Sequence, residues 1–431
     1  MPVRYSCSVA ALTSTLILLS FHANGQTEKP PAIPANYDEA LVGAYTLPDP
    51  LLLANRKKVR DSATWYKQRR PEILQLFEAN MHGRSPGRPE GMTFDVFDKG
   101  TPALDGKTIR RQVTVYFSSD KSGPKMDMVL YLPAGARKPA PLLLCLNFSA
   151  NSNMIDDPGI KPGEVWSREK KKVPASSGRN FGKLKIDPFL DKGFGVAAIY
   201  YGDIEPDFPG GAPYGIRGLF LKSGQTEPAP DEWGAIGAWA WGLSRAMDYL
   251  ETDSGVDAKR VAILGVSRLG KTVLWAGAHD TRFAMVIASC SGEGGASLSR
   301  RNYGETIKHL NTNYGYQFSG NYKKFGDHVD QLPVDAHMLL ALIAPRPVYL
   351  QTGDEDRWSD PKGEFLAAVA AGPVYKLLGK QGLGTETMPA AGEPIMHTIG
   401  YHMHAGKHGT VPSDWDQYLK FMEKHLQPGK E

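Results

Sequence analysis

The sequence predicts an α/β protein in which a mostly parallel sheet lies between two layers of helices. Apolar runs of strand length recur along the chain, at 141–146, 195–201, 261–264, 285–288 and 348–353. Segments of helical spacing or composition, including 233–250 and 269–278, lie between several of these runs. Strands that alternate with helices favour a parallel sheet covered on both faces, and a fully apolar strand is typical of its buried centre.

The N-terminal part of the chain is predicted to be a leader followed by an extension. Arg4 precedes the apolar stretch 9–21, and Ala23-Asn24-Gly25 resembles a cleavage site, so residues 1–25 are predicted to be a signal peptide. The extension covers about 26–110. It begins with a linker rich in proline and alanine and continues with a helix over 61–81 that Pro71 interrupts.

Residues 26–431 are predicted to form a single domain that includes this extension. Further strands are expected over 112–117 and 126–132. Two long insertions are expected, near 205–231, which is rich in glycine and proline, and near 292–331, which is rich in asparagine, tyrosine and glycine. Such loops often carry binding groups in parallel-sheet proteins.

Bulk composition excludes several classes of partner. The chain is 41% hydrophobic and 22% charged, which is ordinary for a globular protein. Its net charge of +4 is small and its one basic run, 168–172, is predicted to be a solvated loop, so nucleic-acid binding has little support. Apart from the leader, no apolar run is long enough to cross a membrane. We expect a secreted bacterial monomer, periplasmic or extracellular, although the sequence does not indicate an oligomeric state.

One stretch, Gly265-Val266-Ser267-Arg268-Leu269-Gly270-Lys271-Thr272, fits two incompatible chemistries. A serine flanked by glycines between a strand and a helix is how α/β-hydrolases present a nucleophile. The same letters satisfy the phosphate-binding loop G-x-x-x-x-G-K-T. A nucleotide site needs a second strand that ends in a carboxylate. The next run, 285–288, leads instead into Ser289-Cys290-Ser291-Gly292, although the later run 348–350 is followed by Asp354. Secretion is the stronger objection, because a secreted domain would meet little ATP. The nucleotide alternative is therefore the remoter one.

A serine nucleophile needs a histidine base and a carboxylate, and in α/β-hydrolases the acid and then the histidine follow the serine in the sequence. Asp356 lies directly after the strand predicted over 348–353, and it is the preferred acid, with Asp354 as its competitor. His408 lies between glycines just before a helix that begins near 412, so it is the preferred base. The other candidates are His397, His402 and His404, of which the last two are spaced like one face of a strand.

A zinc site at the clustered histidines and a disulfide between the two cysteines have less support in the sequence than the serine triad. The clustered histidines could bind zinc, but the His402-x-His404 pair lacks an obvious third ligand, so no metal is predicted. Cys145 and Cys290 lie in or beside apolar runs, where a free cysteine behaves as a small buried hydrophobe. A disulfide would suit an exported protein, but nothing in the sequence shows that the two sulfurs meet.

Three segments together resemble the glucuronoyl esterases, carbohydrate esterase family 15. Gly265 to Lys271 resembles that family's G-C-S-R-x-G-K signature, and Cys290-Ser291-Gly292-Glu293-Gly294-Gly295 resembles its E-S-G-x-G-G segment. Residues 332–337 and 342–346 are similar to the stretch before the family's acid loop. The resemblance covers about 110–426. It implies a three-layer α/β/α sandwich of the α/β-hydrolase fold. The implied reaction is hydrolysis of 4-O-methyl-D-glucuronic acid esters, including those that link glucuronoxylan to lignin, without a cofactor.

Two positions depart from the family pattern. Fungal members carry a catalytic glutamate where this chain has Cys290, and a thiol does not orient a histidine as a carboxylate does. Asp356 lies where bacterial relatives supply the acid, so the exchange supports Asp356. Val266 replaces the cysteine that many members have before the serine, and the disulfide formed there is therefore absent.

The resemblance implies a role for each matching residue. Ser267 is the nucleophile, His408 the base, Asp356 the acid, and Arg268 stabilises the oxyanion through its backbone N–H and its guanidinium. Lys271, Glu305 and Trp358 would bind the sugar. An acetyl-xylan esterase or a general carboxylesterase of the same fold is the nearest alternative, and a silent carbohydrate-binding module is another. The leaving alcohol, the need for the 4-O-methyl group and the length of xylan contacted are not readable from the sequence.

Overall fold

The computed structural model describes residues 33–178 and 181–427. The predicted signal peptide lies outside the described residues, and its boundary stays a prediction. From Ala35 onward the chain groups into one compact unit. Within the described ranges, no helix is long and apolar enough to span a membrane.

A mixed sheet of ten strands runs through this unit, in the order β1-β2-β3-β7-β4-β8-β9-β10-β12-β11. Five adjacent pairs from β7 to β12 are parallel, whereas β1, β2 and β3 form an antiparallel edge. The strands are β1 (Thr93–Ala103), β2 (Thr108–Tyr116), β3 (Lys125–Pro133), β4 (Ala140–Asn147), β7 (Gly195–Tyr200), β8 (Val256–Val266), β9 (Met285–Ser289), β10 (Val348–Gly353), β11 (Ile395–Met396) and β12 (Ile399–His404). A separate two-stranded ribbon pairs β5 (Glu164–Trp166) with β6 (Lys172–Pro174).

Eleven α-helices accompany the strands in the described residues. They are α1 (Ser62–Thr64), α2 (Arg70–Phe77), α3 (Asn151–Met154), α4 (Asp187–Asp191), α5 (Tyr201–Ile204), α6 (Ala235–Leu250), α7 (Arg268–His279), α8 (Ile307–Tyr314), α9 (Ala336–Ile343), α10 (Pro361–Leu377) and α11 (Pro412–Leu426). The helix expected over 61–81 is a continuous helical run from Ser62 to His82, with one π-helical stretch before α2 (Trp65–Arg69) and one after it (Glu78–His82). Pro71 is the second residue of α2 and directly follows the π-helical stretch Trp65–Arg69, so the helical run continues through the proline that was expected to interrupt it.

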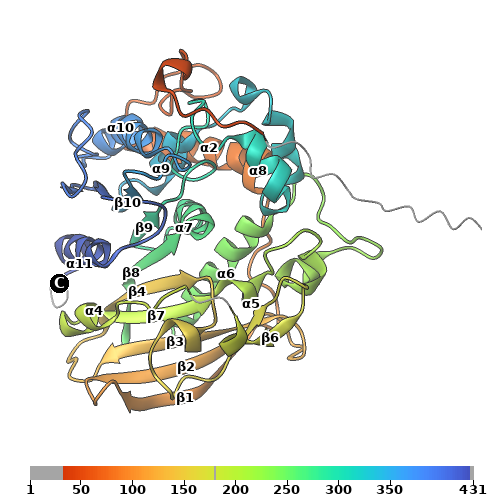
Figure 1. The fold of residues 1–431 in the computed structure, drawn as a ribbon, viewed down its shortest axis with the longest axis vertical. Coiled ribbons are helices and arrows are strands. Elements are labelled where there is room, and N and C mark those ends of the chain that lie inside the picture. The colour runs from red at the N-terminus through yellow and green to blue at the C-terminus, as the bar shows by residue number, and fades with distance from the viewer. Residues whose placement is uncertain (1–32, 179–180, 428–431) are drawn as a thin grey trace, which may run out of the picture. The chain divides into compact units, whose positions relative to one another are not determined.

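Two hydrophobic cores confirm the predicted three-layer architecture. Successive residues of β4 alternate between them: Leu142 and Leu144 face the core formed with α2, α6, α7, α9 and α10, and Leu143 and Cys145 face the core formed with α4 and α11. Figure 1 shows α4 and α11 on one side of the sheet and α6 and α7 on the other. The alternation follows from the period of two along a strand. It explains why these central strands are apolar at every position.

The antiparallel edge departs from the simple prediction. Sequence reasoning did not identify β1, whose residues are mostly exposed or half-buried and include three charged side chains.

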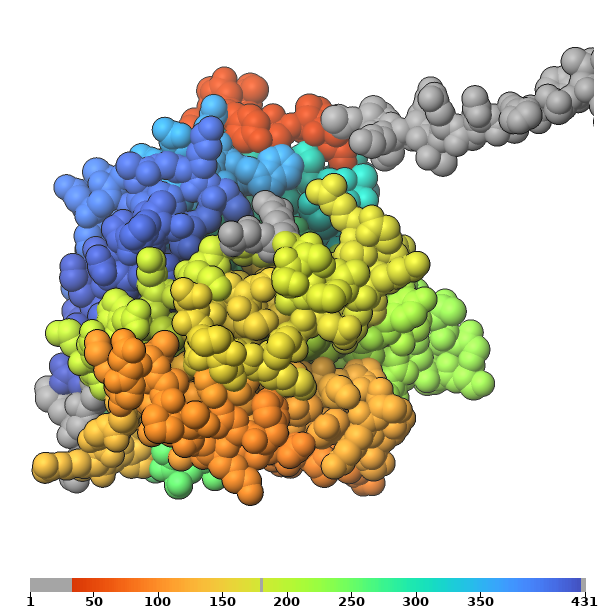
Figure 2. Space-filling view, turned by 60° about the horizontal axis from the view of Figure 1, so that its bottom comes forward, coloured from red at the N-terminus to blue at the C-terminus, as the bar shows by residue number. Residues whose placement is uncertain are grey.

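The predicted insertion near 205–231 contains only short 3-10 turns, and that near 292–331 contains α8 and further short turns. The β5–β6 ribbon lies beside the first insertion, where Trp166 contacts the rings of Phe208 and Tyr214. Figure 2 shows the segment around this ribbon in yellow on the surface, between the orange strands and the blue C-terminal part.

The parallel strands determine where functional loops gather. Because β8, β9, β10 and β12 run in the same direction and are neighbours in the sheet, the turns after them meet at one edge. These four turns begin with Ser267, Cys290, Asp354 and Ala405. The residues singled out from the sequence as nucleophile, acid and base are thus carried by turns at the same edge.

Candidate active site

Ser267 forms a sharp, strained turn between β8 and α7. Its φ of 59° and ψ of −126° lie outside the regions that non-glycine residues favour, which costs on the order of 1–3 kcal/mol. Its backbone N–H donates to the carbonyl of Ser289 at 2.8 Å, so β9 holds the strained turn in place. This is the geometry of a nucleophile elbow, which projects the serine hydroxyl away from the strand.

The glycines around Ser267 are required by close packing. A Cβ at Gly265 would lie 2.1 Å from the carbonyl oxygen of Leu269, and one at Gly270 would lie 2.8 Å from that of Ser289. Both contacts are with backbone atoms, which cannot move aside without opening the turn. The two glycines of the motif therefore serve the fold of the turn, with no need for a phosphate to explain them.

Asp356 and His408 form a hydrogen-bonded pair at the edge where Ser267 lies. His408 Nδ1 lies 2.7 Å from Asp356 Oδ2. The carboxylate is buried, whereas the imidazole side chain is 43% exposed and therefore reachable from solvent. Burial acts to raise the pKa of Asp356, but the hydrogen bond and charge of His408, together with hydrogen bonds from Ser359, outweigh it and hold that pKa below its ordinary value.

Asp354, the competing acid, has a different role in the fold. Its Oδ1 accepts a hydrogen bond from the backbone N–H of Gly406 at 2.8 Å, and its own N–H donates to the carbonyl of His404. It therefore shapes the loop that carries His408 and makes its contacts with backbone atoms. Ser359 adds a further contact to the ring, with Oγ 3.3 Å from His408 Nδ1.

Cys290 contacts the backbone of the His408 loop. Its φ of 45° is in the left-handed region, and its Sγ lies 3.3 Å from both the N and the O of Gly409, which follows His408. Burial raises the pKa of the thiol to about 12, and the nearby carboxylates act in the same direction, so it is neutral. Both described cysteines are free and buried. Through Ser289 and Cys290, the turn after β9 thus contacts both the serine turn and the histidine loop.

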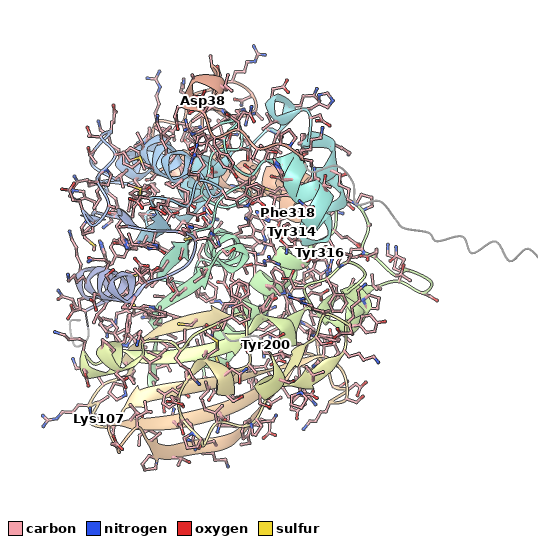
Figure 3. The ribbon with its side chains drawn as sticks, viewed as in Figure 1. Asp38, Lys107, Tyr200, Tyr314, Tyr316 and Phe318 are labelled. Carbon is pink, nitrogen blue, oxygen red and sulfur yellow. The ribbon has the colours of Figure 1, made fainter. Side chains whose placement is uncertain are left out.

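Arg268 is anchored by the insertion near 205–231. Its Nη1 lies 2.5 Å from Asp207 Oδ2, and its guanidinium lies over the ring of Tyr314 with 5.0 Å to the centroid. Tyr201, Tyr316 and Gln317 also donate to Asp207. Tyr314 and Tyr316 lie close together in Figure 3. Burial acts to lower the pKa of Arg268, but the charge of Asp207 outweighs it and raises that pKa, so the cation is permanent.

The three residues predicted to bind the sugar are also brought together. Lys271 Nζ lies 3.4 Å from Glu305 Oε2, and both side chains are largely buried. The backbone N–H of Glu305 donates to the carbonyl of Trp358 at 2.9 Å. Trp358 is 37% exposed, one of the few large apolar side chains of the described residues that reach the surface, and its ring packs edge-on against His309.

The remaining histidine candidates have structural partners. His402 Nε2 and His404 Nδ1 lie 2.8 Å and 3.0 Å from the two carboxylate oxygens of Asp414, and all three side chains are buried. These contacts join β12 to the first turn of α11. His397 lies before β12, away from the edge where the strand ends. Of the four candidates, only His408 lies beside the carboxylate that the sequence favoured.

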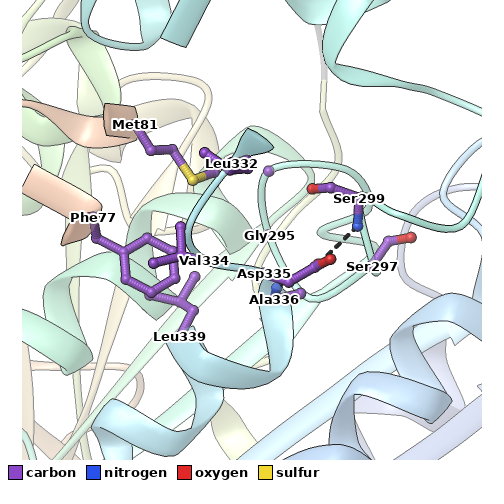
Figure 4. A pocket seen from close by; sticks show the side chains of 11 residues that line it. Phe77, Met81, Gly295, Ser297, Ser299, Leu332, Val334, Asp335, Ala336 and Leu339 are labelled. Carbon is purple, nitrogen blue, oxygen red and sulfur yellow. Dashed lines mark hydrogen bonds between the residues drawn. The ribbon is translucent and has the colours of Figure 1, made fainter. Parts of the chain in front are cut away.

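Two hollows of the described structure lie away from these residues. An enclosed cavity of about 10 Å³ lies beneath the 294–299 segment, where Ser299 N–H donates to Asp335 (Figure 4). That volume holds about one water at most, so it is no substrate site. A surface pocket of about 280 Å³ is lined by residues of 84–86 and 217–233.

Sequence reasoning missed several residues that support this site. Asp207 holds Arg268, and Ser359 contacts the His408 ring. Glu364 on α10 accepts hydrogen bonds from Gly292 N at 2.7 Å and from Ser291 Oγ at 3.1 Å, directly after Cys290. Burial raises the pKa of Glu364 to about 8. No local motif marks these residues, because each acts through a contact that is distant in sequence.

Comparisons with known proteins fit this architecture. The family model for fungal glucuronyl esterases matches residues 228–379. The solved structure of a glucuronoyl esterase from Solibacter usitatus is 50% identical with a TM-score of 0.86, over 90% of this chain and 100% of that one. A promiscuous CE15 esterase from a marine bacterial metagenome is 45% identical with a TM-score of 0.83, over 91% and 100%. The 4-O-methyl-glucuronoyl methylesterase 1 of Wolfiporia cocos is 27% identical over 77% of this chain and 72% of its own.

The fold and these relatives define a carboxylic ester hydrolase of the α/β-hydrolase class. Among the proteins compared, the two bacterial chains share more identity with this sequence than the fungal one does. The chain belongs to carbohydrate esterase family 15, the glucuronoyl esterases.

Proposed function

We propose that this chain hydrolyses esters of 4-O-methyl-D-glucuronic acid, including those that join glucuronoxylan to lignin alcohols, through a Ser267-His408-Asp356 triad. The observation that carries the triad is the 2.7 Å contact between Asp356 and His408 at the sheet edge that also carries the Ser267 elbow. Secretion, predicted from the leader, would bring the enzyme to polymeric substrate.

The geometry supports a two-step reaction through an acyl-enzyme. With Asp356 accepting a hydrogen bond from Nδ1–H, the other ring nitrogen of His408 is available to take the Ser267 proton as the serine oxygen attacks the ester carbonyl. The imidazolium then gives that proton to the leaving alcohol, and a serine ester of the glucuronate remains. Water repeats the sequence: His408 takes its proton, the acid is released, and Ser267 regains its hydrogen.

Arg268 would stabilise the oxyanion that forms in both steps. Its backbone N–H lies in the first turn of α7, where helix geometry leaves amide groups without intrahelical partners. Losing one such donor typically costs about 2.7–4 kcal/mol of transition-state stabilisation. The guanidinium adds a permanent charge, which Asp207 both orients and partly neutralises.

Lys271, Glu305 and Trp358 would hold the sugar. Lys271 lies four residues after Ser267, on the same face of α7, and its contact with Glu305 leaves donors and an acceptor for hydroxyl groups. The exposed ring of Trp358 offers an apolar face to a pyranose. The nucleotide alternative loses support, because the lysine that would bind phosphate faces a carboxylate instead.

Replacement of Ser267 tests the proposal. Ser267→Ala should reduce hydrolysis of a glucuronoyl ester by about 10⁴-fold or more, because the nucleophile is lost. Unchanged cleavage would remove Ser267 from the mechanism. A parallel assay on acetylated xylan separates the nearest rival: faster turnover of the acetyl ester than of the glucuronoyl ester would make the chain an acetyl-xylan esterase.

A further inference from the structure

A cluster of three possible metal ligands is formed by Cys290, Asp356 and His408, and ester hydrolysis by the proposed triad involves only two of them. One ligand atom from each, the thiol sulfur, a carboxylate oxygen and a ring nitrogen, lies within 4.8 Å of the other two. Across residues 33–178 and 181–427, this is the only group of three or more such side chains with that spacing. Hydrolysis by the proposed triad uses the carboxylate and the imidazole, whereas the sulfur only holds the backbone of the His408 loop at Gly409 and takes no part in the reaction.

The three ligand types suit one class of ion. Thiolate and imidazole are soft or borderline ligands that favour Zn²⁺ and its heavier relatives over Mg²⁺ and Ca²⁺. A tetrahedral zinc site takes Cys, His and Asp ligands at about 2.0–2.3 Å, which places the ligand atoms about 3.5 Å apart. Asp356 and His408 are now 2.7 Å apart, so an ion would separate them slightly and draw the sulfur inward.

The position of the cluster gives an ion a way in. Cys290 and Asp356 are buried, but the His408 side chain is 43% exposed, so the ion would enter past the imidazole. Three protein ligands leave a fourth position on that side for water. Asp414 already holds the rings of His402 and His404, so those histidines do not compete for the ion.

We propose that Cys290, Asp356 and His408 bind one thiophilic divalent cation, such as Zn²⁺ or Cd²⁺, and that binding reversibly switches off the esterase. Binding releases the thiol proton of Cys290 to solvent, while the imidazole stays neutral with its proton on the nitrogen that faces away from the ion. The charges of the ion, thiolate and carboxylate then sum to zero. No group is oxidised or reduced. The inhibition rests on the proposed function, because the ion occupies the proposed base and acid, whereas the binding itself does not.

Binding is tested with Zn²⁺ alone by equilibrium dialysis, and with Co²⁺ by its sulfur-to-cobalt charge-transfer absorption, on the full chain. We expect one ion per chain and a charge-transfer band in the wild type. Cys290→Ser should bind at least 30-fold more weakly and lack the band. Asp356→Asn should also bind more weakly. Cys145→Ala, which removes the other described cysteine, should bind like the wild type. Mg²⁺ should not compete.

Two further measurements separate this proposal from the proposed function. Ser267→Ala should keep full binding, because Ser267 is not a ligand, although it lacks activity. In the wild type, Zn²⁺ should abolish hydrolysis and a chelator should restore it. In Cys290→Ser, the Zn²⁺ concentration that halves the variant's own ion-free rate should be at least 30-fold higher than the corresponding concentration for the wild type. Undiminished binding in a folded Cys290→Ser chain, or no binding in the wild type, would overturn the proposal.

Discussion

The turns after β9 and β10 both border His408, but they offer it different groups. The turn after β10 provides Asp356, a buried carboxylate 2.7 Å from Nδ1. The turn after β9 provides Cys290, a neutral thiol that contacts the backbone of Gly409 and not the imidazole. The two turns are therefore neighbours in space with separate tasks. The turn after β10 places a negative charge beside the imidazole, and the turn after β9 holds the backbone of the loop that carries the imidazole.

The fold therefore has two turns from which a side chain can reach His408. Because parallel strands end at a common edge, either turn can place a side chain beside the same histidine. The family resemblance implies an acid at the position of Cys290 in fungal members, whereas the acid proposed here lies one strand further along. The fold determines the edge of the sheet at which these turns meet. The side chains that follow each strand determine which turn can supply a carboxylate to the histidine.

The strongest test of the comparison is Asp356→Asn. Without the carboxylate, His408 loses the partner that fixes its tautomer and stabilises the imidazolium, so kcat should fall by about 10³- to 10⁴-fold. Steady-state kinetics on a glucuronoyl ester measure this. Asp354→Asn is the matched control, because it removes a carboxylate from the same turn that contacts only backbone, and it should cost far less. If Asp354→Asn were the more damaging change, the acid would have to be reassigned.

A second, smaller change in kcat would show whether a carboxylate on the turn after β9 can replace the one on the turn after β10. In the Asp356→Asn background, Cys290→Glu should recover activity by about 10-fold or more, because Cys290 Sγ lies within 4.8 Å of the ring and a carboxylate there can reach it. The control is Cys290→Gln in the same background, which has the same size without the charge. Equal kcat values for the glutamate and glutamine chains would mean that the turn after β9 cannot supply an acid in this protein.

The sequence was informative wherever function depends on a local pattern. The elbow at Ser267 follows from a strand, two glycines and a helix in succession, and the central strands follow from unbroken apolar runs. The choice of His408 followed from its glycine-flanked place before a helix. In the structure its Nδ1 lies 2.7 Å from Asp356 Oδ2, and its role as the base stays a proposal.

Other parts depend on contacts that no local pattern encodes. Asp354 and Asp356 lie in one turn, and they are distinguished by contacts distant in sequence: Asp354 accepts from Gly406 N–H, and Asp356 lies beside His408 Nδ1. Asp207 lies 61 positions before Arg268 in a glycine-rich insertion, without periodicity to mark it. The sequence did not predict β1, because this exposed edge strand buries too little surface to require a run of apolar residues.

The turn after β9 has one more distinguishing feature, the buried Glu364 beneath it, and this predicts an effect on stability. Burial raises the pKa of Glu364 from its ordinary 4.5 to about 8, with Asp356 adding to the rise and the hydrogen bonds from Gly292 and Ser291 opposing it. Between these two values the folded chain keeps a proton that the unfolded chain has released. The contribution of Glu364 to the free energy of unfolding is therefore greatest below about pH 4.5 and is lost as the pH rises through 8.

Glu364→Gln should remove this dependence, because an amide is neutral at every pH and its carbonyl oxygen can still accept from Gly292 and Ser291. We expect the melting temperatures of the variant and the wild type to be similar near pH 4.5. The variant should melt a few degrees higher near pH 8.5, where the wild type must bury a charge. Calorimetry across this range measures the difference, and Glu386→Gln, an exposed control, should show none. A difference that stayed constant with pH would mean that Glu364 does not titrate in the folded protein, and the support beneath Cys290 would then be a matter of packing alone.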